Sequence, residues 1–311
     1  MTTSTNESDT PFAQASRAIV DGDIETLRTL LVAHPALIHE RSSRPHHSTL
    51  LHYVAANGIE DEDQRTPANI LEIAALLLDR GAEVDATSDA YGGGSTVLGL
   101  VATSAHPRAR GVQIALIDLL LARGASLAGE ETLPRLVQWA LANGCPEAAV
   151  ALASRGAHLP TLYAAAGVGD RSSVIARFND ASSGAREAAL IVAAQQGHHD
   201  IVAYLLDHGV DVAASNGMTA LHMASGWCHL ELMQFLIDRG APLEARNEYD
   251  GTVLSSTLWF AYHVVDQEFR RRDYHAALSL LVAAGARVDV YPELLADIEG
   301  VRLRASAQRA T

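Results

Sequence analysis

Fourteen histidines are the residues in this sequence best suited to acid–base or metal chemistry. An imidazole ring titrates near neutral pH and is also a common metal ligand. His46 and His47 are adjacent in a predicted loop, and His106 and His263 each lie in or beside a longer insertion. A zinc site needs about four ligands at fixed spacing, and neither a partner cysteine nor an H-E-x-x-H motif lies near the adjacent pair. We therefore predict an exposed loop at His46 and His47, with no metal and no cofactor.

The remaining residues that suit catalysis lack the motifs that catalysis needs. Gly92–Gly94 is not followed by G-K-[ST], and Ser255 and Ser256 have no G-x-S-x-G context. Cys145 precedes Pro146 at a predicted helix start, where the helix dipole can lower a thiol pKa, but a packing role for this cysteine is favoured. We predict that the chain is not an enzyme.

Composition excludes several other functions. The net charge of −14 argues against nucleic acid, because affinity for nucleic acid rests on neutralising phosphates with Lys and Arg. No run of about 18 apolar residues predicts a membrane span. Residues 1–11 are polar and lack the apolar core of a secretory signal, and the two cysteines form no disulfide framework. We expect a cytoplasmic protein that contacts no membrane.

The elements that must position any site are clearest in residues 216–245. Asn216-Gly217 predicts a turn, and Thr219 can cap a short helix through its hydroxyl. A second helix from about residue 230 carries one apolar stripe and ends at Gly240, where a left-handed cap is needed. This helix pair has one buried face and cannot be stable alone, so we predict an all-α stack of such pairs.

Residues 219–224, Thr-Ala-Leu-His-Met-Ala, resemble the T-P-L-H-x-A signature of the ankyrin repeat, and residues 236–245 are similar to the end of that repeat. The same pattern recurs from Thr49, and less fully elsewhere. Glycines that end second helices at 81, 124, 156, 209, 240 and 285 fit a unit of about 33 residues with insertions. The resemblance implies an ankyrin-repeat solenoid of about eight helix-turn-helix repeats with finger loops over residues 12–290. Residues 1–11 are predicted to be a disordered leader, and residues 291–311 a C-terminal capping helix and tail.

The resemblance also implies structural roles for four histidines. His52 and His222 occupy the T-x-L-H position, where the ring is expected to tie the preceding threonine to the adjoining loop. His198 and His229 lie at or beside the junction between the two helices, where a side chain can satisfy free backbone groups.

The resemblance implies that the protein binds another protein in a groove. The two positions before the interhelical junction usually face the concave side in this family, and exposed aromatic residues are frequent in binding hot spots. The opposing interpretation is that the tryptophans pack against the overlong helix of repeat eight or an insertion. We expect a monomer that binds another protein, through these residues: Trp227, Trp259, Phe260 and the finger residues Tyr91, Tyr249, Asp89 and Asp250.

An alternative is a small-molecule site or enzyme built by the insertions between the helices of repeats two, three and eight. Such insertions can fold as a lid over a polar pocket. The residues of this alternative pocket are His46, His47, Tyr53, His106 and His263. Converging histidines would support it, and separate solvated loops would exclude it.

Overall fold

The computed structural model describes residues 10–59, 64–127, 135–263 and 272–288. The chain divides into two compact units, Met1–Pro160 and Thr161–Thr311, and each is described by itself. Most of the predicted leader, the predicted capping helix and tail at 291–311, and parts of the insertions in repeats two and eight lie outside the described residues.

The first unit consists of short helices with one small hairpin. Its helices and strands, in chain order, are α1 (Pro11–Asp21), α2 (Ile24–Ala33), η2 (Pro35–Ile38), η3 (Leu50–Ala55), α3 (Ile70–Asp79), β1 (Thr87–Ser88), η4 (Ala90–Gly92), β2 (Ser95–Thr96), α4 (Val97–Ala102), α5 (Ala105–Ala109), α6 (Gln113–Ala122), α7 (Leu136–Ala142) and α8 (Pro146–Ser154).

The described residues of the second unit form four helix pairs in sequence. These are α9 (Leu162–Gly167) with α10 (Arg171–Phe178), α11 (Ser183–Gln196) with α12 (His199–Asp207), α13 (Ala220–Gly226) with α14 (Leu230–Asp238), and α15 (Val253–His263) with α16 (Tyr274–Ala283).

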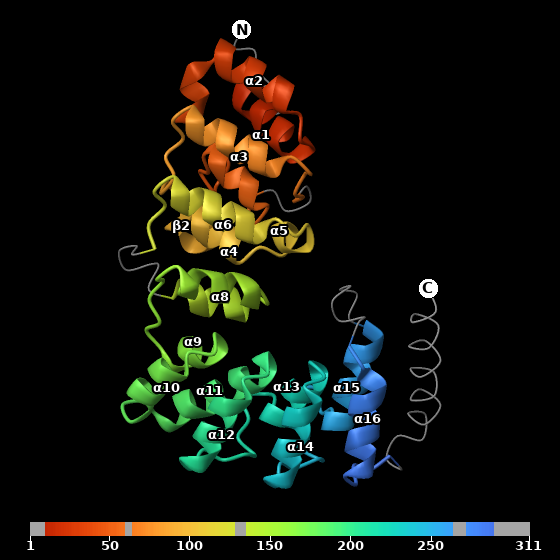
Figure 1. Ribbon diagram of the computed structural model, residues 1–311. Helices are drawn as coiled ribbons and strands as arrows, with labels where there is room; N and C mark the ends of the chain where they lie inside the picture. Colours follow the sequence, from red (N-terminus) through yellow and green to blue (C-terminus); the bar gives the residue numbers. More distant parts are fainter. Residues whose placement is uncertain (1–9, 60–63, 128–134, 264–271, 289–311) are drawn as a thin grey trace. The chain divides into compact units, whose positions relative to one another are not determined.

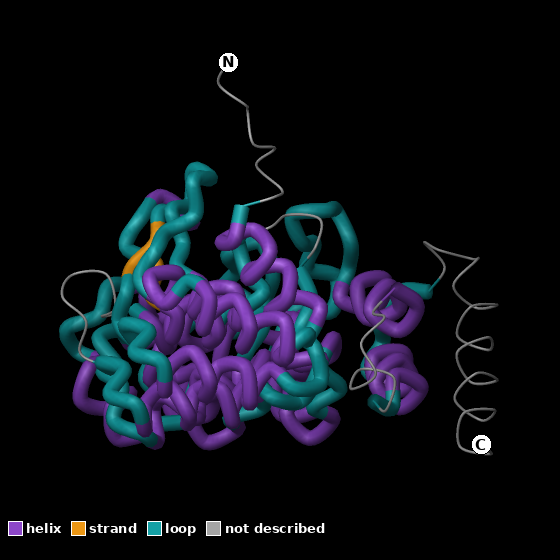
Figure 2. Tube along the Cα trace, turned by 90° about the horizontal axis from the view of Figure 1, so that it is seen from above, coloured by secondary structure: helices purple, strands orange, loops and turns teal. Residues whose placement is uncertain are grey.

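In each pair we call the earlier helix the first helix, the later one the second helix, and the loop that leads into the first helix the finger. First helices pack on first helices: α1, η3, α4 and α7 follow one another in the first unit, and α9, α11, α13 and α15 in the second (Figure 1). Second helices form a parallel row, with α3, α6 and α8 in contact in that order. Helices make up almost all of the regular structure (Figure 2), so the predicted all-α repeat solenoid is confirmed.

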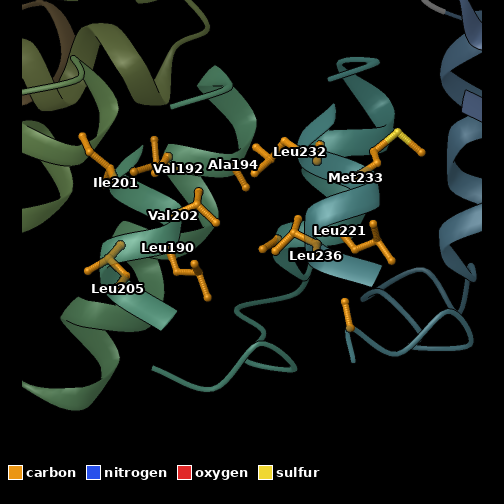
Figure 3. Packing of buried hydrophobic residues seen from close by; sticks show 14 of the residues in the cluster. Leu190, Val192, Ala194, Ile201, Val202, Leu205, Leu221, Leu232, Met233 and Leu236 are labelled. Carbon is orange, nitrogen blue, oxygen red and sulfur yellow. The ribbon is translucent and has the colours of Figure 1, made fainter. Parts of the chain in front are cut away.

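The core is the aliphatic face that each pair presents to its neighbours. In the second unit, Leu190, Val202, Leu205, Leu221 and Leu236 are fully buried and belong to one continuous cluster that runs through successive pairs (Figure 3). Each fully buried side chain of this size contributes about 1.5–3 kcal/mol, most of which requires the neighbouring pair to be present.

The six glycine stops predicted from the sequence all have a positive φ, between 82° at Gly240 and 101° at Gly285. After each stop, the next residue donates its N–H back to a leucine carbonyl in the last turn, as in the 2.9 Å bond from Ala241 to Leu236. This is the Schellman arrangement, which only glycine enters without a steric cost.

Side chains near the start of second helices tie each pair to the one before it. In the second unit, Nε2 of His198 lies 3.2 Å from the Gly167 carbonyl oxygen. Nε2 of His229 lies 2.9 Å from the main-chain carbonyl oxygen of Gln195. The Tyr274 hydroxyl donates to the Gly226 carbonyl at 3.0 Å. In the first unit, Asn69 Nδ2 donates to the Gly22 carbonyl at 2.8 Å. These bonds, which we call tethers, satisfy carbonyl groups at the end of first helices that have no partner within the helix.

An exposed ladder of ion pairs links neighbouring second helices. It joins Asp79 to Arg123 at 2.8 Å, Asp118 to Arg155 at 2.5 Å and Asp207 to Arg239 at 2.9 Å. Exposed pairs of this kind contribute about 0–1 kcal/mol each, so their main effect is on the register of neighbouring repeats.

The first unit contains three features of secondary structure that the sequence analysis did not predict. The first helix of repeat two is a 3₁₀ helix, because the chain turns at once into a left-handed residue at Ala56, with φ 46°. The insertion around Pro107 forms the short helix α5 rather than a loop. The finger before α4 contains an antiparallel strand pair, with Thr87 opposite Thr96 and Ser88 opposite Ser95.

We predict that Leu236→Ala lowers the free energy of unfolding by about 2–5 kcal/mol, because it leaves a cavity between pairs that cannot close. The exposed Val282→Ala on the next second helix is the matched control and should change stability by about 0.5 kcal/mol or less. Urea unfolding followed by circular dichroism measures both variants. Equal losses would show that Leu236 is not part of a shared core.

Candidate functional site

The two T-x-L-H histidines are buried and hydrogen-bonded at both ring nitrogens. His52 Nδ1 accepts from the Thr49 N–H at 3.2 Å, and its Nε2 lies 3.3 Å from the Ser95 carbonyl oxygen in the next finger. His222 repeats this geometry with Thr219 and the Gly251 carbonyl. A ring that accepts at Nδ1 and donates at Nε2 is a neutral imidazole. Together with the tethers from His198 and His229, these bonds confirm the structural roles predicted for the four histidines.

Burial opposes protonation of three of these rings. It lowers the pKa of His52 to about 4 and also lowers the pKa values of His222 and His229, because a charged imidazolium is poorly solvated there. These rings are therefore part of the folded core and not acid–base groups poised at a surface.

Cys145 is buried and Cys228 is partly buried. Cys145 is completely buried, and burial raises the pKa of its thiol despite its place before α8. Burial raises the pKa of Cys228 to about 12. Because the thiolate is the reactive form, neither cysteine is suited to nucleophilic chemistry, and the packing role predicted for Cys145 fits this geometry.

The residues of the alternative pocket are only partly brought together. The His46 ring lies edge-on to Tyr53 with ring centres 6.2 Å apart, and His47 Nδ1 lies 2.7 Å from Asp89 Oδ2. His106 is exposed on α5. The side chain of His263 is outside the described residues.

A cavity of about 550 Å³ lies beside Tyr53, along α1 and the loop at residues 40–44. Its lining includes the cations Arg17, Arg41 and Arg44 together with acidic residues, and none of the pocket histidines is among its lining residues. In the described part of the chain, no group of three or more His, Cys, Asp or Glu side chains is placed to hold a metal ion.

Tyr91 is held in an uncommon conformation at the tip of its finger. Its φ of 55° lies in the left-handed region, which costs a non-glycine residue about 1–3 kcal/mol. The Tyr91 hydroxyl donates to Asn57 Oδ1 at 2.6 Å. The ring lies close to Gly58, where a Cβ atom would be 2.5 Å from a ring carbon. The surrounding chain thus fixes an exposed ring in one position.

Asn57 is itself fixed by the next repeat. Its Nδ2 donates to the Leu100 carbonyl and to Thr103 Oγ1, both at 2.9 Å. The position of the Tyr91 ring therefore depends on a hydrogen-bond network that crosses from repeat two to repeat three.

Tyr91 forms one side of a cavity of about 360 Å³ on the finger side of the first unit, which we call the Tyr91–Trp139 cavity. Asn57 lies beside Tyr91, α4 lines the cavity with Gly99, Leu100 and Thr103, and Trp139 and Asn143 of α7 complete it. All of its lining residues are uncharged.

Three aromatic rings lie together at the end of α13 and along α15 in the second unit. The centres of Trp227 and Phe260 are 5.6 Å apart, and those of Phe260 and Trp259 are 5.5 Å apart. Gly226 permits this contact, because a Cβ atom there would lie 2.9 Å from the Phe260 ring. Trp227 is only half-exposed, because Phe260 packs against it and the Arg272 guanidinium lies 5.7 Å from its ring centre.

Trp227 thus packs against the overlong helix α15, which is the contact that the opposing interpretation describes. Trp259 remains exposed.

The finger acids already have partners within the fold. Asp250 Oδ2 lies 2.8 Å from Arg246 Nη1, and Asp89 lies against His47. Tyr249 is at the tip of the same finger as Asp250, and Asn247 Oδ1 accepts hydrogen bonds from the N–H groups of Tyr249 and Gly251.

Exposed aromatic and aliphatic side chains occupy different sides of the repeats. Among the described residues, the large aromatic side chains that are strongly exposed are Tyr249 (79%), Tyr91 (74%), Trp259 (55%) and Trp139 (40%), and all lie in fingers or first helices. The exposed large aliphatic side chains all lie in second helices: Val32, Val150, Ile175 and Val282.

The sequence reasoning missed Trp139. The rule that the positions before the interhelical junction face a groove applies to Asn143 in repeat four, which does line the cavity. Trp139 precedes Asn143 by one helical turn and shares its face, so adding the i−4 position to the rule would have found it.

Residues 161–247 match the family model described as Ankyrin repeats (3 copies). No curated protein matches the chain at a significant level. Within the described residues, every helix is too short or too polar to cross a bilayer.

We predict that acidification destabilises the fold between about pH 6.5 and pH 4. The unfolded His52 binds a proton below its ordinary pKa near 6.5, whereas the folded ring stays neutral until about pH 4, so stability falls as the pH falls through this window. The full effect of this one ring is about 3 kcal/mol. Urea unfolding of wild type and His52→Asn across the window should show a shallower pH dependence in the variant.

Leu236→Ala is the control for this experiment, because it destabilises without removing a titrating group. It should keep the wild-type pH dependence. If His52→Asn also keeps it, the ring does not resist protonation in the folded state.

We predict that both thiols react slowly in the native protein, because burial raises their pKa values and excludes the reagent. Reaction with Ellman's reagent should be fast in urea and limited by unfolding in buffer. Rapid native labelling of either cysteine, located by mass spectrometry, would contradict this.

Proposed function

We propose that this ankyrin-repeat chain is a monomeric scaffold that holds another protein against its fingers and first helices. Ankyrin repeats are generally protein–protein interaction modules and typically have no enzymatic activity. The proposal adds which side of this chain binds and through which side chains.

The single observation that carries the proposal is the segregation of exposed side chains. Tyr91, Trp139, Tyr249 and Trp259 all lie on the finger and first-helix side. Among the described residues, the large apolar side chains that second helices strongly expose are all aliphatic. Chance exposure would scatter rings over both sides. Tyrosine and tryptophan supply a large contact area at a low entropic cost, which is why they are frequent in hot spots.

The Tyr91–Trp139 cavity differs from the second-helix side in charge chemistry. The second helices carry the ladder that joins Asp79, Asp118 and Asp207 to arginines of the following repeats. A partner on that side would have to compete with these ion pairs. On the finger side, the Tyr91–Trp139 cavity is lined by uncharged residues, so a partner can displace water there without breaking an ion pair.

Pre-organisation supports the same side. The ring of Tyr91 is fixed by Asn57 and by the close approach to Gly58, and the ring of Phe260 is fixed against Gly226 beside Trp259. A side chain that is already ordered loses little entropy when a partner binds.

We predict that removing the four exposed rings abolishes capture of a partner. A variant with Tyr91, Trp139, Tyr249 and Trp259 changed to Ala should lose a partner that wild type captures from native extract after crosslinking. The loss should be about 30-fold or more in affinity, which corresponds to about 2 kcal/mol for a hot spot.

The matched control changes four exposed aliphatic residues of the second helices, Val32, Val150, Ile175 and Val282, to Ala. It removes a similar number of exposed apolar side chains from the other side and should retain the partner. Both variants should unfold within a few degrees of wild type. Loss of the partner in the control alone would place binding on the second helices and overturn the proposal.

A further inference from the structure

We propose that the Tyr91–Trp139 cavity is a specificity pocket for an uncharged, extended peptide segment, which inserts one large apolar side chain between α4 and the two rings. This inference rests on the proposed function and names the chemistry of the partner at one place on the first unit.

The lining chemistry determines the class of occupant. Charged residues are about a fifth of the chain at 19%, yet none lines this cavity. A charged side chain placed there would lose its hydration without gaining a counter-ion, which is costly. An apolar side chain would instead gain contact with Leu100 and the two rings. The cavity thus selects against charge as well as for apolar surface.

The polar groups of the cavity are already engaged with the fold. Asn57 bonds to Tyr91, Leu100 and Thr103, and Asn143 Nδ2 donates to the Trp139 carbonyl at 2.9 Å. The Ser95 hydroxyl donates to the Ala90 carbonyl at 2.7 Å. A ligand that needs many side-chain hydrogen bonds would have to break this network, whereas an apolar side chain would not.

The glycines of the finger favour an extended main chain as the carrier of that side chain. Gly93 and Gly94 line the cavity without side chains, and a Cβ atom on Gly92 would meet nothing within 4 Å. Glycine allows another backbone to approach closely. An extended segment passing along this loop can therefore reach main-chain groups while its side chain enters the cavity, as in other modes of strand-like recognition.

The cavity volume fits one side chain rather than an element. At about 360 Å³ it is near the lower end of the range for binding pockets. A helix has a diameter of about 10–12 Å with its side chains and does not enter a space of this size. The strain at Tyr91, with φ 55°, supports a binding role, since strained residues cluster at ligand clamps.

The test begins with a random linear peptide library displayed on phage and panned on the full chain. Selected peptides should carry a large apolar residue with uncharged neighbours. Fluorescence anisotropy with a selected peptide should show that Tyr91→Ala and Trp139→Ala each weaken binding by about tenfold or more. Replacing the apolar residue of the peptide with Asp should abolish binding.

Val150→Ala is the matched control, because Val150 is also an exposed apolar residue of the first unit but lies on the second helix α8 and does not line the cavity. It should leave the affinity for the selected peptide unchanged. Tyr91→Phe keeps the ring but loses the hydroxyl bond to Asn57, so its effect should be smaller than that of Tyr91→Ala. Circular dichroism confirms that each variant is folded.

Three results would overturn this inference. The first is that the selected peptides bind Tyr91→Ala and Trp139→Ala as tightly as wild type. The second is that the selected sequences are rich in charged residues. The third is that panning enriches no peptide. If selected peptides instead lose binding only with Trp259→Ala, the cavity assignment fails and the proposed function stands. If a partner captured from native extract ignores all four rings, the proposed function itself fails.

Discussion

Burial of one aliphatic face between neighbouring helix pairs is the constraint on which the rest of the structure depends. A pair such as α13 with α14 cannot cover Leu221 and Leu236 by itself, so both leucines reach full burial only between adjacent pairs. Because that face is used for stacking, the side chains left to meet other molecules are those of the fingers, the outer side of the first helices and the outer side of the second helices. Repeat arrays of this kind use such extended surfaces for binding.

Local signals in the sequence predicted the helix pairs well. The apolar stripe and the glycine stop at Gly240 placed α14 within a residue or two, because both signals act within one or two helical turns. The structural role of the T-x-L-H histidines could also be predicted, since Thr49 and His52 are close in sequence and the hydrogen bond between them is local.

The candidate site was less predictable, because its geometry depends on residues that are distant in the chain. Trp227 loses part of its exposure to Phe260, which belongs to the next repeat. The position of the Tyr91 ring depends on Gly58 and on Asn57, which is itself held by α4. No pattern in the sequence around Tyr91 indicates that Trp139 lines the same cavity. Which aromatic rings are exposed, and which lie near one another, depends on how the repeats stack. Helix caps and apolar stripes depend on one segment of the chain only.

The tethers show that different side chains can make the same contact between neighbouring repeats. In each tether the acceptor is a main-chain carbonyl, which is present whatever residue stands at that position. The donors are by contrast diverse: an amide at Asn69, imidazoles at His198 and His229, and a phenol at Tyr274. The junction therefore requires a hydrogen-bond donor near the start of the second helix and no one particular residue type.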